Sequence, residues 1–174
     1  MNSKDTEKFM PDSYGRILQA FTHKGYRVVN FEEVDPDSWH LILRHDIDVD
    51  LNYGLKLAEF EYELGYRSCY FIMLTSEQYN PATTENRHAI KRMVSLGHRI
   101  GLHFDTSVNS TENLEERALI ERKYLSDLAN TEVSILSFHR PSDIWINNPN
   151  DFAGLIHTYQ PQYFADIGYC SDSG

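Results

Sequence analysis

Apolar runs and amphipathic segments alternate along this chain. Short apolar runs of the kind that form buried strands lie at residues 27–31, 41–44, 68–74, 99–102, 133–138 and 167–171. Segments in which apolar residues recur at helical spacing lie at residues 12–23, 51–64, 85–96, 111–129 and 151–159. Strands that alternate with helices predict βαβ units and a mainly parallel sheet. We therefore expect an α/β fold.

The helix expected in residues 111–129 has the clearest pattern. Its Glu, Lys and Arg side chains are directed outward, and four leucines are expected on the buried side: Leu114, Leu119, Leu125 and Leu128. Gly65 and Gly97 mark the ends of the two preceding helices. No repeat, low-complexity tract or linker interrupts the sequence, so we expect residues 1–174 to form a single domain.

Side chains that can bind a metal follow four of the predicted strands. They are His45, Asp46 and Asp48 after the second strand, His103 and Asp105 after the fourth, His139 after the fifth, and Asp172 after the last. The carboxyl ends of parallel strands share one face of a barrel or open sheet, and that face carries the active site in such proteins. We therefore expect these side chains to meet in one site.

Asp46 and Asp48 lie two residues apart in the stretch LILRHDIDVDLN, residues 41–52. If the extended conformation continues through them, both carboxylates point to the same side. Two like charges held that close repel each other, and a bound cation would neutralise the pair. The alternative is a loop in which the two aspartates cap the following helix. The polar residues at the other strand ends favour the metal site.

The residue types in this set favour a divalent first-row metal. Carboxylates and imidazoles from several strands suit zinc, which is the default for such mixed sites. A catalytic zinc ion has three protein ligands and keeps one position open. A nearby carboxylate that is not a ligand can then act as a general base. The expected cofactor is Zn²⁺ or another divalent first-row metal.

Composition narrows the range of partners. The net charge is −10 and no cluster of Lys or Arg is present, which argues against nucleic acid and anionic membranes as partners. No segment approaches the roughly twenty apolar residues of a membrane span, and the N-terminal sequence lacks the apolar core of a signal peptide. We therefore expect a cytoplasmic protein. Cys69 and Cys170 are expected to be small buried residues without a disulfide.

Three motifs of this sequence resemble, in their order, the first three motifs of the polysaccharide deacetylases, the carbohydrate esterase family 4. They are RHDID at residues 44–48, GHRIGLHFD at 97–105 and SFHRPS at 137–142. The resemblance covers residues 40–174 and leaves residues 1–39 as an N-terminal helix and strand. It implies an irregular (β/α) barrel and a divalent metal, usually zinc, that serves the hydrolysis of an acetyl group on a sugar.

The resemblance assigns roles to individual residues. Asp46 is similar to the catalytic base and Asp48 to the metal-binding aspartate, although the family usually has these two residues adjacent. His103 matches the first metal-binding histidine. Arg140 belongs to the third motif, whose arginine pairs with the catalytic aspartate, and Asp172 falls where a fourth motif is expected.

The third metal ligand is left open by one departure from the family pattern. The second metal-binding histidine of the family lies four residues after the first, where this chain has Ser107. We expect His139 to take its place, with Asp105 as the alternative if the strand continues through it. His45 should point away from Asp46 in a regular strand, which favours a packing role over ligation.

The expected function is that of a metal-dependent hydrolase that removes an acetyl group from an N-acetylated sugar. The expected cytoplasmic location suggests a precursor in surface-polysaccharide biosynthesis as the substrate, and the protein could form an oligomer. One alternative is a catalytically lapsed homologue that binds a sugar or a protein partner. Another is a hydrolase of a different carbon–nitrogen bond, because fold and metal do not identify the substrate.

The chain offers about five strands from residue 41 onward, fewer than the eight of a full (β/α) barrel. The resemblance also implies a late histidine that acts as general acid, and the sequence after residue 169 provides none. We expect that the 174 residues are part of a longer protein or, less favoured, that a second chain covers the open edge. If neither is the case, the general acid would have to be His45 or the metal-activated water.

Overall fold

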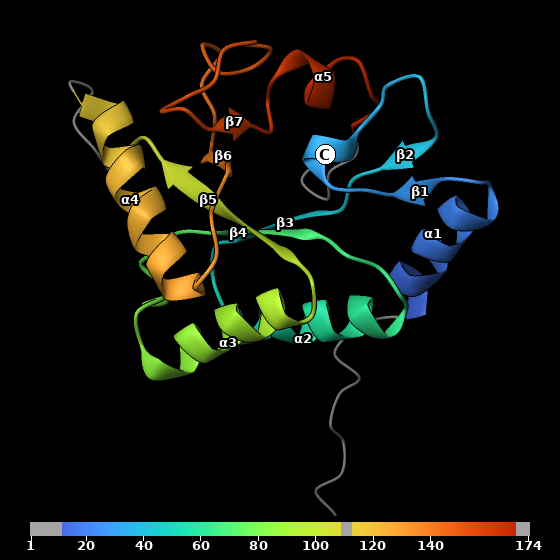
Figure 1. Ribbon diagram of the computed structural model, residues 1–174, viewed down its shortest axis with the longest axis horizontal. Helices are drawn as coiled ribbons and strands as arrows, with labels where there is room; N and C mark the ends of the chain where they lie inside the picture. Colours follow the sequence, from blue (N-terminus) through green and yellow to red (C-terminus); the bar gives the residue numbers. More distant parts are fainter. Residues whose placement is uncertain (1–11, 109–112, 170–174) are drawn as a thin grey trace, which may run out of the picture.

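The computed structural model describes residues 12–108 and 113–169 (Figure 1). Within these ranges, five strands form one parallel sheet in which each strand pairs with the next along the chain. The strands are β3 (Arg44–Ile47), β4 (Cys69–Ile72), β5 (Arg99–Asp105), β6 (Ile135–His139) and β7 (Ile156–His157). This order and direction confirm the predicted α/β fold with a parallel sheet.

Three helices connect these strands and pack on one side of the sheet (Figure 1). They are α2 (Leu51–Glu63), α3 (Thr84–Ser95) and α4 (Leu114–Ala129). Helix α1 (Asp12–His23) packs beside α2, where the rings of Tyr14 and Phe60 lie 6.4 Å apart. The remaining elements are short: β1 (Arg27–Val28), η1 (Phe31–Glu33), β2 (His40–Leu41) and α5 (Pro161–Phe164).

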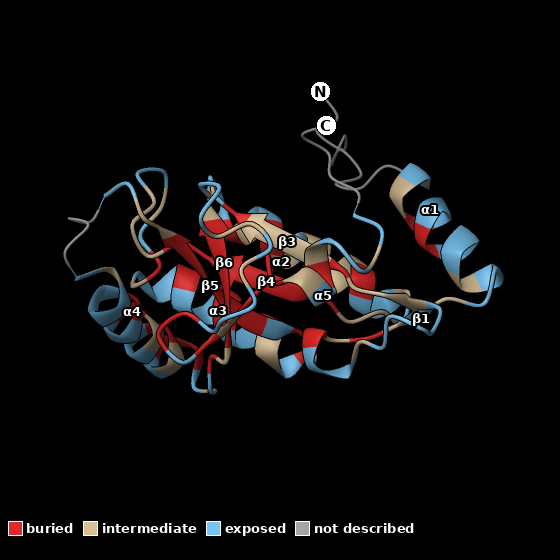
Figure 2. Ribbon diagram, turned by 90° about the horizontal axis from the view of Figure 1, so that it is seen from above, coloured by how far each residue is buried: buried red, intermediate tan, exposed pale blue. Residues whose placement is uncertain are grey.

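Both faces of the central sheet are buried, as the uninterrupted apolar strand β4 shows. Tyr70 and Ile72 belong to the main core cluster on the side of the helices. Cys69 and Phe71 point to the other face and form a smaller cluster with Phe31 of η1. Figure 2 shows the buried residues concentrated along the strands of this sheet. The second face, on which η1 and α5 pack among the described elements, also carries the polar side chains of the candidate site.

The apolar run at residues 41–44 does not form one strand. Leu41 ends β2, which pairs with β1, whereas β3 begins at Arg44 and continues to Ile47. Asp46 therefore lies inside a strand and not after one. Because side chains two apart share a face, Arg44 and Asp46 point to the same side of the sheet.

The prediction of a helix at residues 151–159 is wrong. Phe152 and Leu155 exchange two backbone hydrogen bonds of 2.9 Å across a two-residue turn. Ala153 and Gly154 at the centre of this turn have φ angles of 54° and 68°. Positive φ at both central positions is the geometry of a tight hairpin turn and is incompatible with a helix. The strand β7 follows directly.

Two smaller predictions also differ from the structure. Leu119 is 46% exposed, because the buried side of α4 is formed by Ala118 and Leu125, which lie two helical turns apart. Residues 167–169 do not form the expected strand, and residues 170–174, with Cys170 and Asp172, lie outside the described residues. Cys69 is a buried free thiol, as expected.

The central sheet is open in the part of the chain that the structure describes. Strands β3 and β7 are its two edges, and no pairing between them closes a barrel. The fold class is thus confirmed as α/β with a parallel sheet, without detected closure of the expected barrel. No helix within these described ranges is long and apolar enough to cross a membrane.

Candidate metal centre

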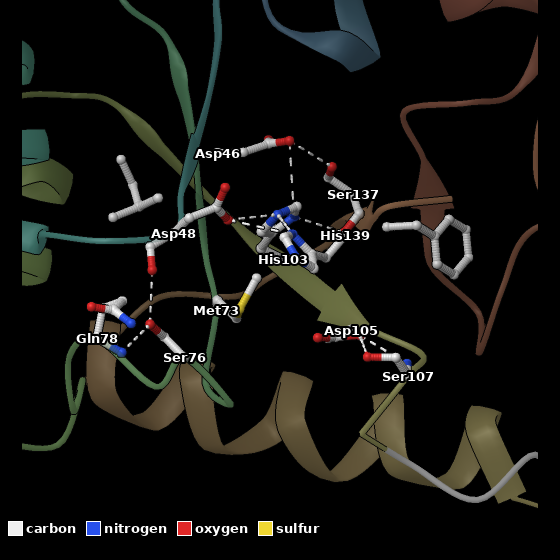
Figure 3. Close-up of polar contacts among 12 residues, drawn as sticks. Asp46, Asp48, Met73, Ser76, Gln78, His103, Asp105, Ser107, Ser137 and His139 are labelled. Atoms are coloured by element: carbon white, nitrogen blue, oxygen red, sulfur yellow. Dashed lines mark hydrogen bonds and ion pairs between the residues drawn. The ribbon is translucent and has the colours of Figure 1, made fainter. Parts of the chain in front are cut away.

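The carboxyl ends of β3, β5 and β6 bring three metal-capable side chains together (Figure 3). Asp48 follows β3, His103 lies in β5 and His139 ends β6. Asp48 Oδ1 lies 3.1 Å from His103 Nε2 and 3.5 Å from His139 Nδ1, and the two nitrogens are 3.2 Å apart. These are the residues that the sequence predicted as metal ligands, and the structure places them in one cluster, hereafter the ligand triangle.

The ligand triangle has the dimensions of a tetrahedral metal site. Donor atoms about 2.1 Å from a zinc ion at tetrahedral angles lie about 3.4 Å from one another. The three separations of 3.1, 3.2 and 3.5 Å fall around that value. One carboxylate and two imidazoles also form a ligand set that leaves a fourth position open. The residues present therefore fit a divalent ion.

His103 is held in a ligand-ready orientation by the backbone of the neighbouring strand. Its side chain is 2% exposed, and its Nδ1 lies 3.2 Å from the carbonyl oxygen of Ser137, its register partner on β6. A neutral imidazole that donates from Nδ1 carries its lone pair on Nε2, the atom that faces Asp48. Two acceptors facing each other need a cation or an additional proton between them.

Asp48 is the most accessible member of the triangle, with a side chain that is 47% exposed. When no metal is bound and His103 Nε2 carries a proton, its hydrogen bond to Asp48 lowers the pKa of the carboxyl, and the charges of the two histidines and of Arg140 lower it further against the opposing effect of partial burial. Ser76 donates a hydrogen bond of 2.8 Å to the backbone carbonyl of Asp48 and fixes the chain beyond β3. The carboxyl is thus kept ionised, as a metal ligand must be.

Asp46 lies beside the ligand triangle and is not part of it. Its Oδ2 is 3.9 Å from His103 Nδ1, and its side chain is 25% exposed. Arg44 binds both of its oxygens, with Nε 3.0 Å from Oδ1 and Nη2 2.6 Å from Oδ2. Ser137 Oγ donates a further hydrogen bond of 3.3 Å to Oδ2. A carboxylate that faces the site without belonging to the ligand set has the position that a general base requires.

The arginine that pairs with Asp46 is Arg44, whereas the motif resemblance implied Arg140. Arg140 is exposed, follows β6 with a φ of 49°, and its charge acts on Asp48. The sequence pattern did not place Arg44 in the site because the expected strand ended at this residue. The continuation of β3 to Ile47 brings Arg44 onto the face of Asp46.

Asp105, the alternative third ligand, lies apart from the ligand triangle (Figure 3). It is the register partner of His139, and its Oδ1 accepts hydrogen bonds of 2.8 and 2.7 Å from the backbone nitrogen and hydroxyl of Ser107. Ser107, at the position where the family has its second histidine, therefore shapes the loop after β5 and does not join the three ligands. The geometry therefore favours His139 over Asp105 as the third metal ligand.

The opposite face of β3 carries a polar cluster that the sequence did not predict. His45 points away from Asp46, as strand alternation requires, and its Nε2 lies 2.7 Å from Oε1 of the buried Glu61. The hydroxyls of three further residues donate to the same carboxylate: Tyr14, Ser68 and Tyr70. Burial raises the pKa of Glu61, but the hydrogen bond and charge of His45, with the hydroxyl donors, lower it to about 2. His45 is thus committed to Glu61 and does not face the ligand triangle.

No family model matches this sequence, and no curated protein matches it at a significant level. Solved structures with a similar fold include the following two. The Streptococcus pyogenes deacetylase PplD, determined in complex with acetate, matches 76% of this chain with a TM-score of 0.61 and 16% sequence identity. IcaB from Ammonifex degensii matches 73% of it with a TM-score of 0.55 and 14% identity. The chain covers 65% of each of those chains, less than two thirds of their length.

These comparisons establish the fold. The chain shares the fold of the deacetylase PplD and of IcaB. In parallel α/β folds the active site lies at the carboxyl ends of the strands. The ligand triangle and Asp46 occupy that edge of the sheet, so the candidate site is in the expected place for an enzyme of this architecture.

Proposed function

We propose that this protein is a metal-dependent deacetylase that hydrolyses the acetamide group of an N-acetylated sugar. The observation that carries the proposal is the triangle of Asp48, His103 and His139 beside the arginine-bound carboxylate of Asp46. A bound divalent ion, with zinc as the first choice, would supply a Lewis acid that polarises the acetyl carbonyl. Because one carboxylate is the only charged member of this ligand set, the bound divalent ion would keep a net positive charge toward the substrate.

Asp46 is the proposed general base. It would take a proton from the attacking water, whose oxygen bonds to the acetyl carbon as the carbon–nitrogen bond breaks. The products are acetate and the free amine of the sugar, and the proton held by Asp46 is available to the departing nitrogen. His45 cannot supply that proton, because it is bound to Glu61 on the other face of β3.

The proposed substrate class rests on the sequence motifs and on the fold. An acetylated precursor of a surface polysaccharide, acted on in the cytoplasm, is the part of the proposal that the sequence alone suggested. The geometry of the site supports hydrolysis at the acetyl group, and the identity of the sugar and of its carrier is to be determined by experiment. A substrate panel should therefore include free N-acetylglucosamine oligomers and a nucleotide-linked N-acetyl sugar.

Acetate release from this panel tests the proposal. We expect release by zinc-loaded protein, loss of release after removal of metal by a chelator, and recovery after zinc is returned. Asp127→Asn, at an exposed position of α4, is the matched control and should behave as the wild type. Release that is insensitive to the chelator would contradict metal dependence. Binding of a sugar without acetate release from metal-loaded protein would identify the chain as a binding homologue.

A further inference from the structure

Arg44 is fixed by polar contacts of its guanidinium atoms Nε and Nη2. Nε and Nη2 hold the two oxygens of Asp46 at 3.0 and 2.6 Å, which is the bidentate geometry of strong arginine–carboxylate pairs. Nη2 also lies 2.6 Å from Ser137 Oγ and 3.0 Å from the hydroxyl oxygen of Tyr159. These partners come from β3, from β6 and from the segment after β7, so the guanidinium joins three parts of the fold at the edge of the site.

Aromatic rings add to this fixation. The Cζ atom of Arg44 lies 5.6 Å from the ring centre of Phe71 and 5.1 Å from that of Tyr159, both within the range of cation–π interactions. The ring of Phe71 in turn lies over Gly101, where a Cβ atom would come within 2.4 Å of Phe71 Cε1. A lysine could not reproduce both the planar fork and the stacking, because its ammonium group is a point charge.

The pair is largely shielded from solvent. The side chain of Arg44 is 14% exposed and that of Asp46 is 25% exposed. Removing one partner of a pair at this depth leaves the other charge poorly solvated and unpaired. Arg140, in contrast, is exposed, and among the described residues it makes no hydrogen bond or ion pair with Asp46.

We propose that Arg44 is the positioning residue for Asp46, and that it orients the carboxylate from within the same strand. The inference rests on the proposed function, since that function makes Asp46 the base. It differs from the arrangement implied by the third motif, in which the arginine after β6 would hold the base. Asp46 would keep its orientation without Arg140, and would lose it without Arg44.

Rescue by guanidinium tests this assignment. Arg44→Ala removes the fork and leaves a space bounded by Asp46, Phe71 and Tyr159. We expect kcat for acetate release to fall about 100-fold, within the range for loss of effective general-base catalysis, with zinc still bound and KM changed much less. Guanidinium chloride at about 20 mM, far below denaturing concentrations, should restore kcat at least about tenfold. Arg140→Ala is the matched control, in which guanidinium should restore nothing, and sodium chloride controls for salt.

A second measurement does not depend on turnover. Guanidinium should raise the Tm of Arg44→Ala in a saturable way, and should not do so in the double variant Arg44→Ala/Asp46→Asn. A wild type without acetate release would overturn the proposed function, while this measurement would still decide whether Arg44 holds Asp46. If Arg44→Ala does not fold, Arg44→Lys replaces it and should fold with a reduced kcat. Full activity in either variant, or a response to guanidinium only in Arg140→Ala, would overturn the assignment of Arg44.

Discussion

His103 Nε2 lies 3.2 Å from His139 Nδ1, and the two ring planes meet at 89°, although 36 residues separate them in the sequence. The adjacent strands β5 and β6 are in a register that pairs His103 with Ser137 and Asp105 with His139. The two histidines are therefore diagonal neighbours, and this offset lets their nitrogens converge on one point. Asp48 reaches the same point from β3, on the far side of β4. Three strands thus contribute one ligand atom each.

Paired substitutions on β5 and β6 distinguish the two candidates for the third ligand. His139→Gln should weaken zinc binding at least about 100-fold, because it removes a donor atom of the triangle. Asp105→Asn should weaken it much less, since Asp105 Oδ1 is occupied by Ser107. Calorimetric titration of zinc into metal-free protein measures the zinc affinity of both variants. His88→Gln, at an exposed position of α3, is the histidine control. The opposite ranking would move the third ligand to Asp105.

Replacing the proposed base should separate metal binding from turnover. Asp46→Asn keeps the shape of the side chain and the triangle intact, so zinc affinity should stay close to that of the wild type. The rate of acetate release should fall about 10²- to 10⁴-fold, the usual contribution of a general base. Both quantities can be measured on the same preparation. A variant that turns over at the wild-type rate would show that another group takes the proton.

The Glu61 cluster should make stability depend on pH. The pKa of Glu61 in the folded protein is about 2, below its ordinary value of 4.5, so folding stabilises the ionised form. This contribution is present above pH 4.5 and is lost as the pH falls toward 2. Glu61→Gln should therefore lower the free energy of unfolding by about 3 kcal/mol at pH 7, and the difference from the wild type should shrink below pH 4.5.

Urea denaturation at a series of pH values between 7 and 3 measures this difference. Glu63→Gln is the matched control, because Glu63 is exposed on the same helix, and its effect should stay within about 0.5 kcal/mol at every pH. A difference between wild type and Glu61→Gln that stays constant over the whole range would contradict an ionised, His45-bound Glu61.

The contact between Gly101 and Phe71 links packing to the site. A methyl group at residue 101 would lie 2.4 Å from Phe71 Cε1, so the ring that packs against Arg44 would have to move. Gly101→Ala should lower the free energy of unfolding by about 1–3 kcal/mol, as overpacking does, and should also reduce acetate release. Gly168→Ala, where no atom lies within 4 Å of the added methyl, is the control in thermal denaturation. Unchanged stability of Gly101→Ala would show that Phe71 can shift freely.

The sequence predicted the ligand triangle because all three members belong to strand ends, which periodicity locates well. Asp48, His103 and His139 each follow or end an apolar run, and the parallel order of the strands places those ends on one edge. The predicted bounds of the strands were less accurate. The start of β3 at Arg44 depends on pairing with β4, which begins at Cys69, and local hydrophobicity carries no information on that pairing.

Features that depend on single backbone angles or on tertiary partners were missed. The turn at Ala153 and Gly154 interrupts a stretch whose apolar spacing resembles a helix, and Gly154 was the available signal for it. Glu61 occupies the buried stripe of α2 with Leu51 and Ala58, a place where a carboxylate requires partners. Those partners come from α1, from β3, from the loop before β4 and from β4, so only the folded chain reveals that His45 is among them.

Titration of metal-free protein with zinc, with acetate release recorded after each addition, tests the central claim most directly. The account predicts that release is absent at the start, rises in proportion to added zinc and stops rising at one equivalent. Asp48→Asn should show no rise over the same range, whereas Asp127→Asn should follow the wild type. Full release before any metal is added, or an unchanged titration in Asp48→Asn, would contradict a deacetylase whose metal is held by Asp48, His103 and His139.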